Sequence, residues 1–209
     1  KVAKQAGAAL NSSSTNLTLN LMKRSTSNYN PIEKFLSKIP KAEKIDLLKR
    51  AYVKAKNYDP IISQVMVNYM EEEQNIMVAN TEGLLTSDTR VRTRFSVGSV
   101  ASKDGEMQQG YCAPGASMGF EFYDKVNVED IAIEASRIAK TMVYADYCPS
   151  GVMPVIIDNE FGGVLFHEAC GHALEASFVS KGTSAFAGKL GEIIASPLVT
   201  AIDDGTISN

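Results

Sequence analysis

The sequence predicts an α+β fold, in which an antiparallel β-meander packs with helices and the start of a second, β-rich domain follows. Three observations lead to this prediction. Runs with a period of two residues are concentrated between residues 61 and 123. Helical patterns with one apolar face flank them at 41–56 and 127–144. A further apolar helical segment begins after Cys148-Pro149-Ser150-Gly151, a sequence typical of a hinge or linker.

The predicted domain boundaries follow from these shifts in pattern. Residues 1–40, rich in Ser, Asn and Thr, form the end of an N-terminal α/β segment, with a strand expected at 16–22. Residues 41–150 form a central region of helix, meander and helix, and residues 151–209 begin a second, C-terminal domain. Because the chain opens on Lys1 rather than Met, we expect a fragment or a processed chain.

The helix at 41–56 should end before Pro60, because the residue preceding a proline is pushed out of the helical region. Its apolar residues are expected to form the buried stripe: Ile45, Leu48, Tyr52 and Ala55. The meander that follows should have about four strands, centred on 65–70, 76–78, 91–97 and 118–122, with a hairpin turn at Lys103-Asp104-Gly105.

Three arginines alternate along one strand of this meander and share one of its faces: Arg90, Arg92 and Arg94. They are candidates for binding acidic peptides, and the exposed edge of the meander is a second candidate, because an extended peptide can add to it as a strand. A solvated strand face is the more common explanation of such a pattern.

The helix at 127–144 has the clearest pattern. Asn127 can cap it, with Asp130 three positions on, much as in a capping box. Its expected buried stripe consists of Ile131, Ala135, Ile138, Ala139 and Met142. Beyond the linker we expect a short strand at 153–157, a helix from about Phe161 to Phe178, a strand-like run at 198–202 and a turn at 203–206.

Composition excludes several classes of protein. A net charge of −3 over 209 residues shows no basic surplus, so no direct partnership with nucleic acid is expected. No run of about 18 apolar residues is present, so no membrane span is expected. Three widely spaced cysteines, at 112, 148 and 170, do not form a disulfide framework and favour a reducing, cytoplasmic location.

The chain has two histidines, and both lie in Phe166-His167-Glu168-Ala169-Cys170-Gly171-His172. The spacing H-E-x-x-x-H is one residue longer than the H-E-x-x-H of many zinc enzymes, in which histidines four apart share a helical face. On an ideal helix with roughly 100° per residue, His167 and His172 point about 140° apart.

Two geometries resolve this conflict. A π-bulge, eased by Gly171, would bring the histidines together. An undistorted helix would instead align Glu168, His172 and Glu175, a set that resembles the ligands of bundle metal sites. Two ordinary half-buried histidines are the structural alternative, and we favour a metal or catalytic role over it. Cys170 would point away from His172 on an ideal helix and is better explained as a small buried residue.

The segment from Gly163 to Glu175 closely resembles the signature of the catalytic, TldD-like members of the TldD/PmbA family of metallopeptidases. Lys181-Gly182-Thr183-Ser184 with Gly188 and Gly191-Glu192, and then Val199 to Thr206, resemble the next family blocks. The resemblance implies a metal-dependent peptidase that cleaves unfolded or modified peptides and works as a homodimer, or as a heterodimer with a PmbA/TldE-type subunit. It also implies that residues 151–209 are the start of the C-terminal metallopeptidase domain, in a fragment that lacks the far N-terminus and most of that domain.

Carried over by position, the resemblance makes His167 and His172 ligands of one divalent metal, zinc or iron, and makes Glu168 the general base. Glu175 would be an outer-sphere partner of a ligand histidine or an alternative ligand. The family's third ligand is a downstream cysteine, and no cysteine follows Cys170 here, which implies that this fragment alone is inactive. The alternatives are a non-catalytic peptide-binding or regulatory module, of the DNA gyrase modulator type, and a metal-dependent oxidoreductase.

Overall fold

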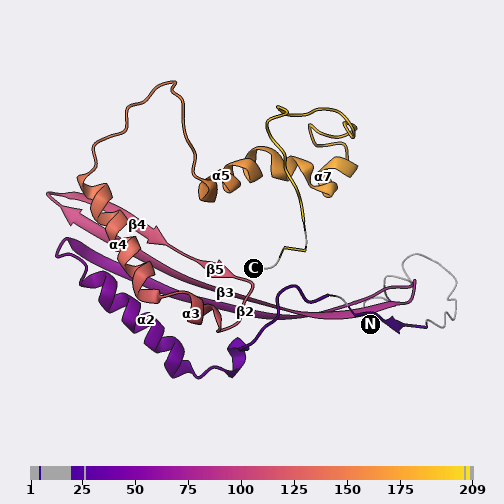
Figure 1. Cartoon of the computed structure of the whole chain (residues 1–209), viewed down its shortest axis with the longest axis horizontal. Coiled ribbons are helices and arrows are strands. Elements are labelled where there is room, and N and C mark those ends of the chain that lie inside the picture. The colour runs from indigo at the N-terminus through magenta and orange to yellow at the C-terminus, as the bar shows by residue number, and fades with distance from the viewer. Residues whose placement is uncertain (1–4, 6–19, 26, 205, 208–209) are drawn as a thin grey trace. The chain divides into compact units, whose positions relative to one another are not determined.

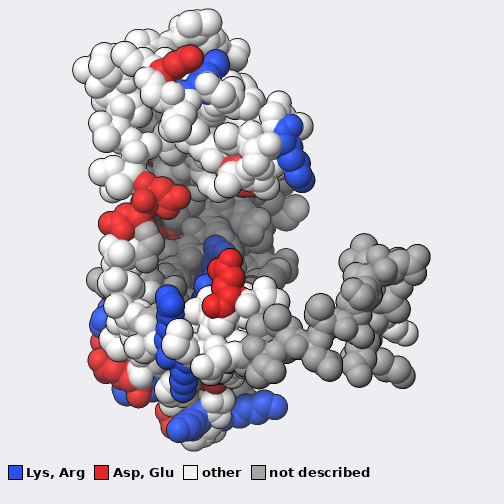
Figure 2. Space-filling model, turned by 90° about the vertical axis from the view of Figure 1, so that its right-hand side faces the viewer, with Lys and Arg blue, Asp and Glu red and all other residues white. Residues whose placement is uncertain are grey.

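The computed structural model describes residue 5 and residues 20–25, 27–204 and 206–207. The chain divides into two compact units, Lys1–Asp146 with Thr206–Asn209 and Tyr147–Gly205. Among the described residues, no helix is both long enough and apolar enough to cross a membrane. On the face seen in Figure 2, basic and acidic side chains of the described residues are interspersed, so this face carries no broad surface of one sign.

The larger unit is built on a mixed sheet (Figure 1). Its strands are β1 (Met22–Lys23), β2 (Ile62–Ala79), β3 (Leu84–Lys103), β4 (Glu106–Cys112) and β5 (Gly115–Ala116). The long β3 lies at the centre. It pairs antiparallel with β2 along its length on one edge, and on the other edge it pairs parallel with β1 and antiparallel with β4 and β5. The predicted α+β class is therefore confirmed, while most of the strand expected at 16–22 lies outside the described residues.

Two tight turns set the register of the long strands. Asp104 and Gly105 join β3 to β4 with φ values of 51° and 88°, as a hairpin turn with two left-handed residues requires, and this confirms the predicted hairpin. At the β2–β3 turn the Asn80 side chain accepts hydrogen bonds from the N–H groups of Glu82 and Leu84, each at 3.0 Å. The resulting register pairs Ala79 with Leu85 at the turn.

The break expected in the strand pattern at residues 71–75 is not present, because β2 runs straight through it. Two of the three acidic side chains there have partners on neighbouring elements. Lys44 Nζ lies 2.7 Å from a Glu71 oxygen, and the Ser37 N–H donates to Glu73 at 2.7 Å. These contacts hold charged residues on a strand that their polarity alone would have interrupted.

Helices α2 (Lys41–Lys56) and α4 (Val128–Tyr144) lie side by side on one face of the sheet, and both predicted spans are confirmed. The predicted stripe of α2 is partly wrong. Its buried residues are Leu47, Ala51 and Ala55, whereas Ile45 and Tyr52 are 45% and 47% exposed. The reason is that α2 packs against both the sheet and α4, which centres the buried face on the i, i+4, i+8 row and turns Ile45 and Tyr52 outward.

Helix α4 buries small residues and lies close to the sheet. Its buried residues are Val128, Ile131, Ala132, Ala135, Ser136 and Ala139, whereas the predicted Ile138 is only half-buried and Met142 is exposed. As predicted, Asn127 caps the helix, accepting from the Glu129 N–H at 2.9 Å. Inside the core, the Ser99 and Ser136 hydroxyls lie 2.8 Å apart, and Ser136 donates to the Ala55 carbonyl, which links β3, α4 and α2.

The strand expected at 118–122 is wrong. This segment forms a loop and then the short helix α3 (Phe122–Lys125). The buried Glu121 carboxylate takes the place of a sheet partner, accepting from the N–H groups of Lys34 and Gly119 at 2.8 Å each. Burial by itself raises the pKa of Glu121, but the backbone N–H donors outweigh it and hold the pKa below the ordinary value. The loop is thereby tied to the chain just before the short 3-10 helix η1 (Leu36–Lys38).

The smaller unit consists of short helices and irregular chain. Its helices are α5 (Asn159–Phe166), the π-helical segment η2 (His167–Gly171), α6 (His172–Leu174) and α7 (Ala176–Ser180). The strands expected at 153–157 and 198–202 are not formed: Val155 and Leu198 are 71% and 93% exposed, and no described segment of this unit offers them a sheet to join. The turn expected at 203–206 includes Gly205, which is outside the described residues.

Candidate metal centre

The H-E-x-x-x-H segment contains a π turn. The described helix runs from α5 directly into η2, which spans His167–Gly171, and then into α6. The His172 N–H donates to the His167 carbonyl, five residues back instead of four. Such a bond places residues five apart above one another. Of the two geometries that the spacing left open, the structure therefore has the bulged one.

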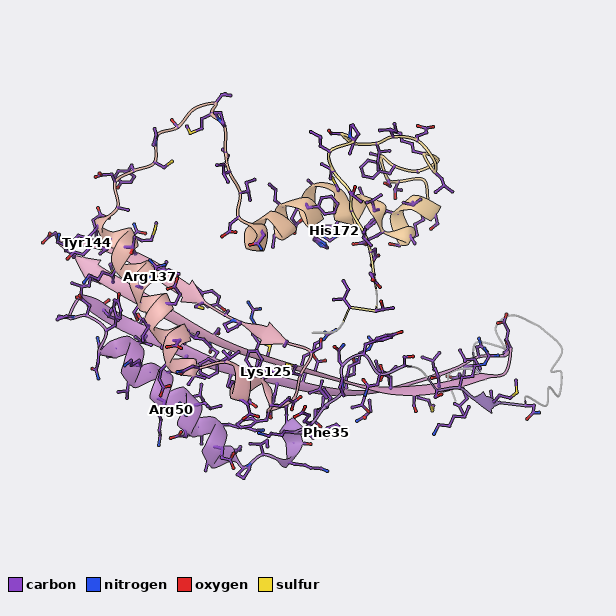
Figure 3. All side chains as sticks on the ribbon, viewed as in Figure 1. Phe35, Arg50, Lys125, Arg137, Tyr144 and His172 are labelled. Atoms are coloured by element: carbon purple, nitrogen blue, oxygen red, sulfur yellow. The ribbon has the colours of Figure 1, made fainter. Side chains whose placement is uncertain are left out.

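The π turn brings both imidazoles together on one side of the helix, where Figure 3 labels His172. The ring centroids of His167 and His172 lie 4.3 Å apart with an angle of 66° between the ring planes. Glu168 joins them, with its Oε2 3.7 Å from His172 Nε2. One ligand atom from each of these three residues lies within 4.8 Å of the others. Two imidazoles and a carboxylate at this separation are a donor set that suits zinc or iron.

Gly171 gives His167 the room for this arrangement. A Cβ atom on residue 171 would stand 3.1 Å from His167 Nδ1 and 3.5 Å from its Cγ. The imidazole thus lies directly against the glycine backbone, and a side chain there would push the ring aside. The glycine in the motif is explained by this close approach as well as by the bulge.

Glu175 fixes the orientation of the second histidine. Its Oε1 lies 2.7 Å from His172 Nδ1, which leaves Nε2 on the side of Glu168. The hydrogen bond to Glu175, helped by the charges of Glu175 and Glu168, raises the pKa of His172 above its ordinary value. A carboxylate on the far nitrogen of an imidazole is the usual outer-sphere arrangement around a metal-binding histidine.

The chain ends its helix at Glu175 and so positions this carboxylate. Glu175 has an extended backbone (φ −61°, ψ 131°) that separates α6 from α7. The Ser184 hydroxyl donates to the Ala173 carbonyl, and the Thr183 hydroxyl donates to the Phe178 carbonyl at 3.2 Å. Sequence reasoning did not assign these two hydroxyls a role, although both stand in the Lys181-Gly182-Thr183-Ser184 block. They close the loop that follows the motif back onto it.

The site is open to solvent. The side chains of His172, Glu168 and Glu175 are 51%, 64% and 44% exposed. Cys170 is half-buried and is not part of the ligand group. The exposed faces of the two histidines leave room for further ligands and for a substrate.

The three arginines singled out in the sequence belong to the other unit. They are exposed on β3, on the face of the sheet away from α2 and α4. Arg90 Nε lies 3.8 Å from Asp88 Oδ2, whereas Arg92 and Arg94 form no ion pair with any residue that the structure describes.

Comparison with known proteins gives matches along most of the chain. Residues 35–143 match the family model described as the PmbA/TldA metallopeptidase central domain, and residues 150–209 match that of the C-terminal domain. A metalloprotease TldD homolog from Buchnera aphidicola is 36% identical over 189 residues, covering 87% of this chain and 38% of the relative. Its counterpart from Haemophilus influenzae is 35% identical over 190 residues, covering 86% and 39%. The chain thus spans about two fifths of the length of these curated relatives.

Two solved structures have a similar fold. One, from Thermotoga maritima and described as a candidate modulator of a DNA gyrase, superposes with a TM-score of 0.71 at 22% identity, covering 90% of this chain and 42% of that one. The other, from Bacteroides thetaiotaomicron and described in similar terms, has a TM-score of 0.70 at 16% identity, covering 85% and 40%. At these identities the likeness concerns the fold.

Proposed function

The chain belongs to the TldD/PmbA family of metallopeptidases, and we propose that it supplies the metal-binding and proton-transferring residues of a peptidase that cleaves unfolded or modified peptides. The observation that carries the proposal is the π turn, which gathers His167, Glu168 and His172 into one group. An undistorted helix would keep the two histidines about 140° apart.

His167 and His172 would hold one divalent metal, zinc or iron. The fit rests on the donor atoms themselves: the rings are close, and His172 Nε2 is kept free because Nδ1 is engaged by Glu175. A metal bound here would supply Lewis acidity and would lower the pKa of a water molecule at the site. The TldD resemblance implies one more protein ligand, a cysteine, and the two histidines leave space for it.

Glu168 would act as the general base. Its Oε2 is 3.7 Å from His172 Nε2, so that it lies beside the two imidazoles without being tied up in a short hydrogen bond. From there the carboxylate can take a proton from the attacking water and return it to the leaving amine of the cleaved peptide. Proton transfer of this kind contributes roughly 10²–10⁴-fold to rates.

Glu175 would position His172 rather than bind the metal. Because it contacts Nδ1, it lies on the opposite side of the ring from Glu168 and holds the ring plane. The alternative ligand set of Glu168, His172 and Glu175 would require Glu175 to leave this hydrogen bond. We further propose that the protein works as a homodimer or with a second, PmbA-like subunit. A cytoplasmic location remains a prediction from its cysteine content.

The test is turnover of a flexible fluorogenic peptide by the full-length protein, with metal content measured in the same samples. Glu168→Gln should lower turnover by about 100-fold or more while leaving the metal content unchanged. Glu192→Gln is the matched control, since Glu192 is an exposed glutamate of the same unit and is not part of the ligand group. Wild-type turnover by Glu168→Gln would rule out its role as base. A metal-free wild-type protein would favour the non-catalytic binding module.

A further inference from the structure

One edge of β3 has an open stretch between two paired segments. On the side away from β2, Leu85 is paired with Lys23 of β1, and Thr93 is paired with Ala116 of β5. Between these pairings, no strand of the described residues lies opposite the residues from Thr86 to Arg92. This stretch, called the open edge below, covers roughly 20 Å at about 3.3 Å per residue.

The backbone of the open edge presents hydrogen-bonding groups outward. Arg24 N–H donates to the Leu85 carbonyl at 2.8 Å, and Phe95 N–H donates to the Pro114 carbonyl at 3.0 Å. The backbone N–H and C=O groups of odd-numbered residues in β3 therefore point away from β2. The register with β2 is unbroken from Leu85 to Phe95, so this alternation holds throughout the open edge. The Ser87 N–H and the carbonyls of Ser87 and Thr89 must point outward in the same way, and both residues are exposed. The Thr89 N–H is already engaged, because it donates to Asp88 Oδ1 at 2.8 Å.

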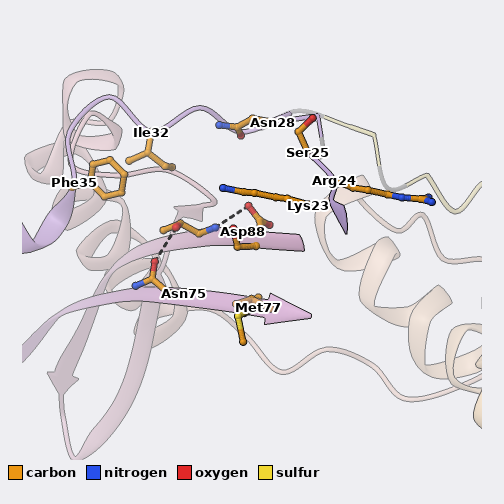
Figure 4. A pocket seen from close by; sticks show the side chains of 12 residues that line it. Lys23, Arg24, Ser25, Asn28, Ile32, Phe35, Asn75, Met77 and Asp88 are labelled. Atoms are coloured by element: carbon orange, nitrogen blue, oxygen red, sulfur yellow. Dashed lines mark hydrogen bonds between the residues drawn. The ribbon is translucent and has the colours of Figure 1, made fainter. Parts of the chain in front are cut away.

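A cavity of about 660 Å³ lies beside the open edge, on the face of the sheet that carries α2 and α4. Residues from three segments line it, among them Lys23, Asn28, Ile32, Phe35, Asn75 and Thr89. Figure 4 shows Lys23 extended between its walls, with Ile32 and Phe35 at one end, whereas Arg24 points away. The Thr89 hydroxyl donates to Asn75 Oδ1 at 2.8 Å, so the polar wall is held in place.

The charge around the open edge is mainly positive. Lys23 and Arg24 form no ion pair with any described residue, and Arg92 forms none on the opposite face. Two acids lie nearby. Asp88 Oδ1 accepts from the Thr89 N–H at 2.8 Å and its Oδ2 lies 3.8 Å from Arg90. Glu72 of β2 stands opposite Arg92 in the register of the two strands. Side chains of an added strand would alternate between the Lys23 cavity and the arginine face, and both would favour acidic residues.

We propose that the open edge of β3 binds an acidic peptide segment in extended conformation, as an added strand with one of its side chains in the Lys23 cavity. Backbone hydrogen bonds with the Ser87 N–H and with the carbonyls of Ser87 and Thr89 would supply affinity, and the cations on both faces would supply the preference for acidic residues. The site lies wholly within the larger unit. It goes beyond the peptidase proposal, since this binding needs neither the metal nor hydrolysis.

The probe is a fluorescein-labelled hexapeptide with alternating valine and glutamate, followed by fluorescence anisotropy on the full chain. A valine–lysine hexapeptide tests the charge preference. A valine–glutamate peptide with N-methylated backbone at alternate residues tests the added strand, because it lacks the donors that a strand needs. Binding of the probe to His167→Ala should equal binding to wild type, so that this proposal and the peptidase proposal can fail separately.

Two variants alter the open edge and one serves as control. Lys23→Glu should weaken binding about tenfold, because it replaces an attraction with a repulsion. Ser87→Pro should weaken binding about fivefold by removing an outward donor. The proline leaves the β2 ladder intact because the Ser87 N–H points away from it. Lys125→Glu, an exposed cation at the end of α3, should change binding less than twofold.

Several results would overturn the proposal. They are an absence of saturable binding to the wild-type chain, equal binding of the lysine peptide, and equal binding of the N-methylated peptide. Unchanged affinity of a folded Ser87→Pro variant would count against it too, and if that variant fails to fold, the N-methylated peptide on wild type carries the same test. A wild-type dimer that Ser87→Pro dissociates in the absence of peptide would show that a second copy occupies this edge instead.

Discussion

Replacing Gly110 with alanine should force α4 away from the sheet. Gly110 lies on β4, where α4 passes so close that a Cβ atom would stand 2.0 Å from the Ala135 carbonyl oxygen and 2.4 Å from the Ala139 nitrogen. Both of those atoms belong to helix backbone, which cannot rotate out of the way. An ordinary carbon–oxygen contact would require the helix to retreat by about 1 Å.

A retreat of this size weakens the whole α4 interface. The face that would be lifted is made of completely buried small residues: Ala132, Ala135, Ser136 and Ala139. A gap of 0.5–1 Å forfeits about a quarter to a half of each dispersion contact. Overpacking generally costs about 1–3 kcal/mol, and because two backbone atoms are involved we expect Gly110→Ala to lie at about 3 kcal/mol. That corresponds to a fall of roughly 10 °C in Tm.

Gly98→Ala is the matched control. Gly98 lies on the neighbouring strand β3, and a Cβ there would meet only side-chain atoms, Gln109 Nε2 at 3.4 Å and a Tyr111 ring carbon at 3.6 Å. It should be neutral, or stabilising by up to about 1 kcal/mol, because glycine is unfavourable in a strand. Thermal unfolding followed by circular dichroism measures both variants. Equal Tm values for Gly110→Ala and wild type would refute the close approach of α4.

Three further predictions concern the core, the buried carboxylate and the metal site. Ser136→Ala should destabilise the protein by about 1–3 kcal/mol, because it leaves the buried Ser99 hydroxyl without a partner. In urea unfolding, the Ser99→Ala/Ser136→Ala double variant should be at least as stable as Ser136→Ala alone. Additive losses of stability from the two substitutions would contradict this. Glu121→Gln should destabilise by about 2 kcal/mol at neutral pH. Because the folded pKa of Glu121 lies below its ordinary 4.5, this contribution is present above that pH and disappears as the pH falls through the folded value. The difference in stability between the two proteins should therefore narrow as the pH falls below 4.5, and a difference that stays constant would count against this role of Glu121. Gly171→Ala should weaken zinc binding about tenfold in calorimetric titration by displacing the His167 ring. Unchanged affinity for zinc would show that the His167 ring does not need the space beside Gly171.

The parts of the fold that sequence predicted correctly depend on local chemistry. The Asp104-Gly105 turn requires two left-handed residues, which Asp and Gly tolerate. Helices α2 and α4 are bounded by Pro60 and by the Asn127 cap, which act within a few residues of the helix ends. Such signals can be read without knowing what packs against the element.

The errors arose where distant contacts decide the outcome. The buried face of α2 is set by α4, which lies some eighty residues further along the chain, so Ile45 and Tyr52 could not be placed by periodicity alone. The alternation at Phe120 and Phe122 suggested a strand, but Glu121 satisfies backbone groups of the loop and replaces sheet pairing. The segment at 153–157 has a strand's composition and no described partner strand.

The candidate site shows the same division. The residues His167, Glu168 and His172 were evident from spacing and residue type, and so was the conflict between that spacing and an ideal helix. Which of the two geometries resolves the conflict depends on the path of the backbone, and the hydrogen bond from His172 to the His167 carbonyl settles it. The positions of Ser184 and Thr183 depend on the loop closing back, which no local pattern reveals.

X-ray absorption at the zinc edge shows whether His167 and His172 hold the same ion, because it counts the imidazoles around a metal bound to the chain. We expect two imidazoles in the wild-type protein and in Glu168→Gln, and one in each of His167→Ala and His172→Ala. A single imidazole in the wild-type protein, unchanged by His167→Ala, would contradict it. That result would mean that the π turn does not join the two histidines into one metal site.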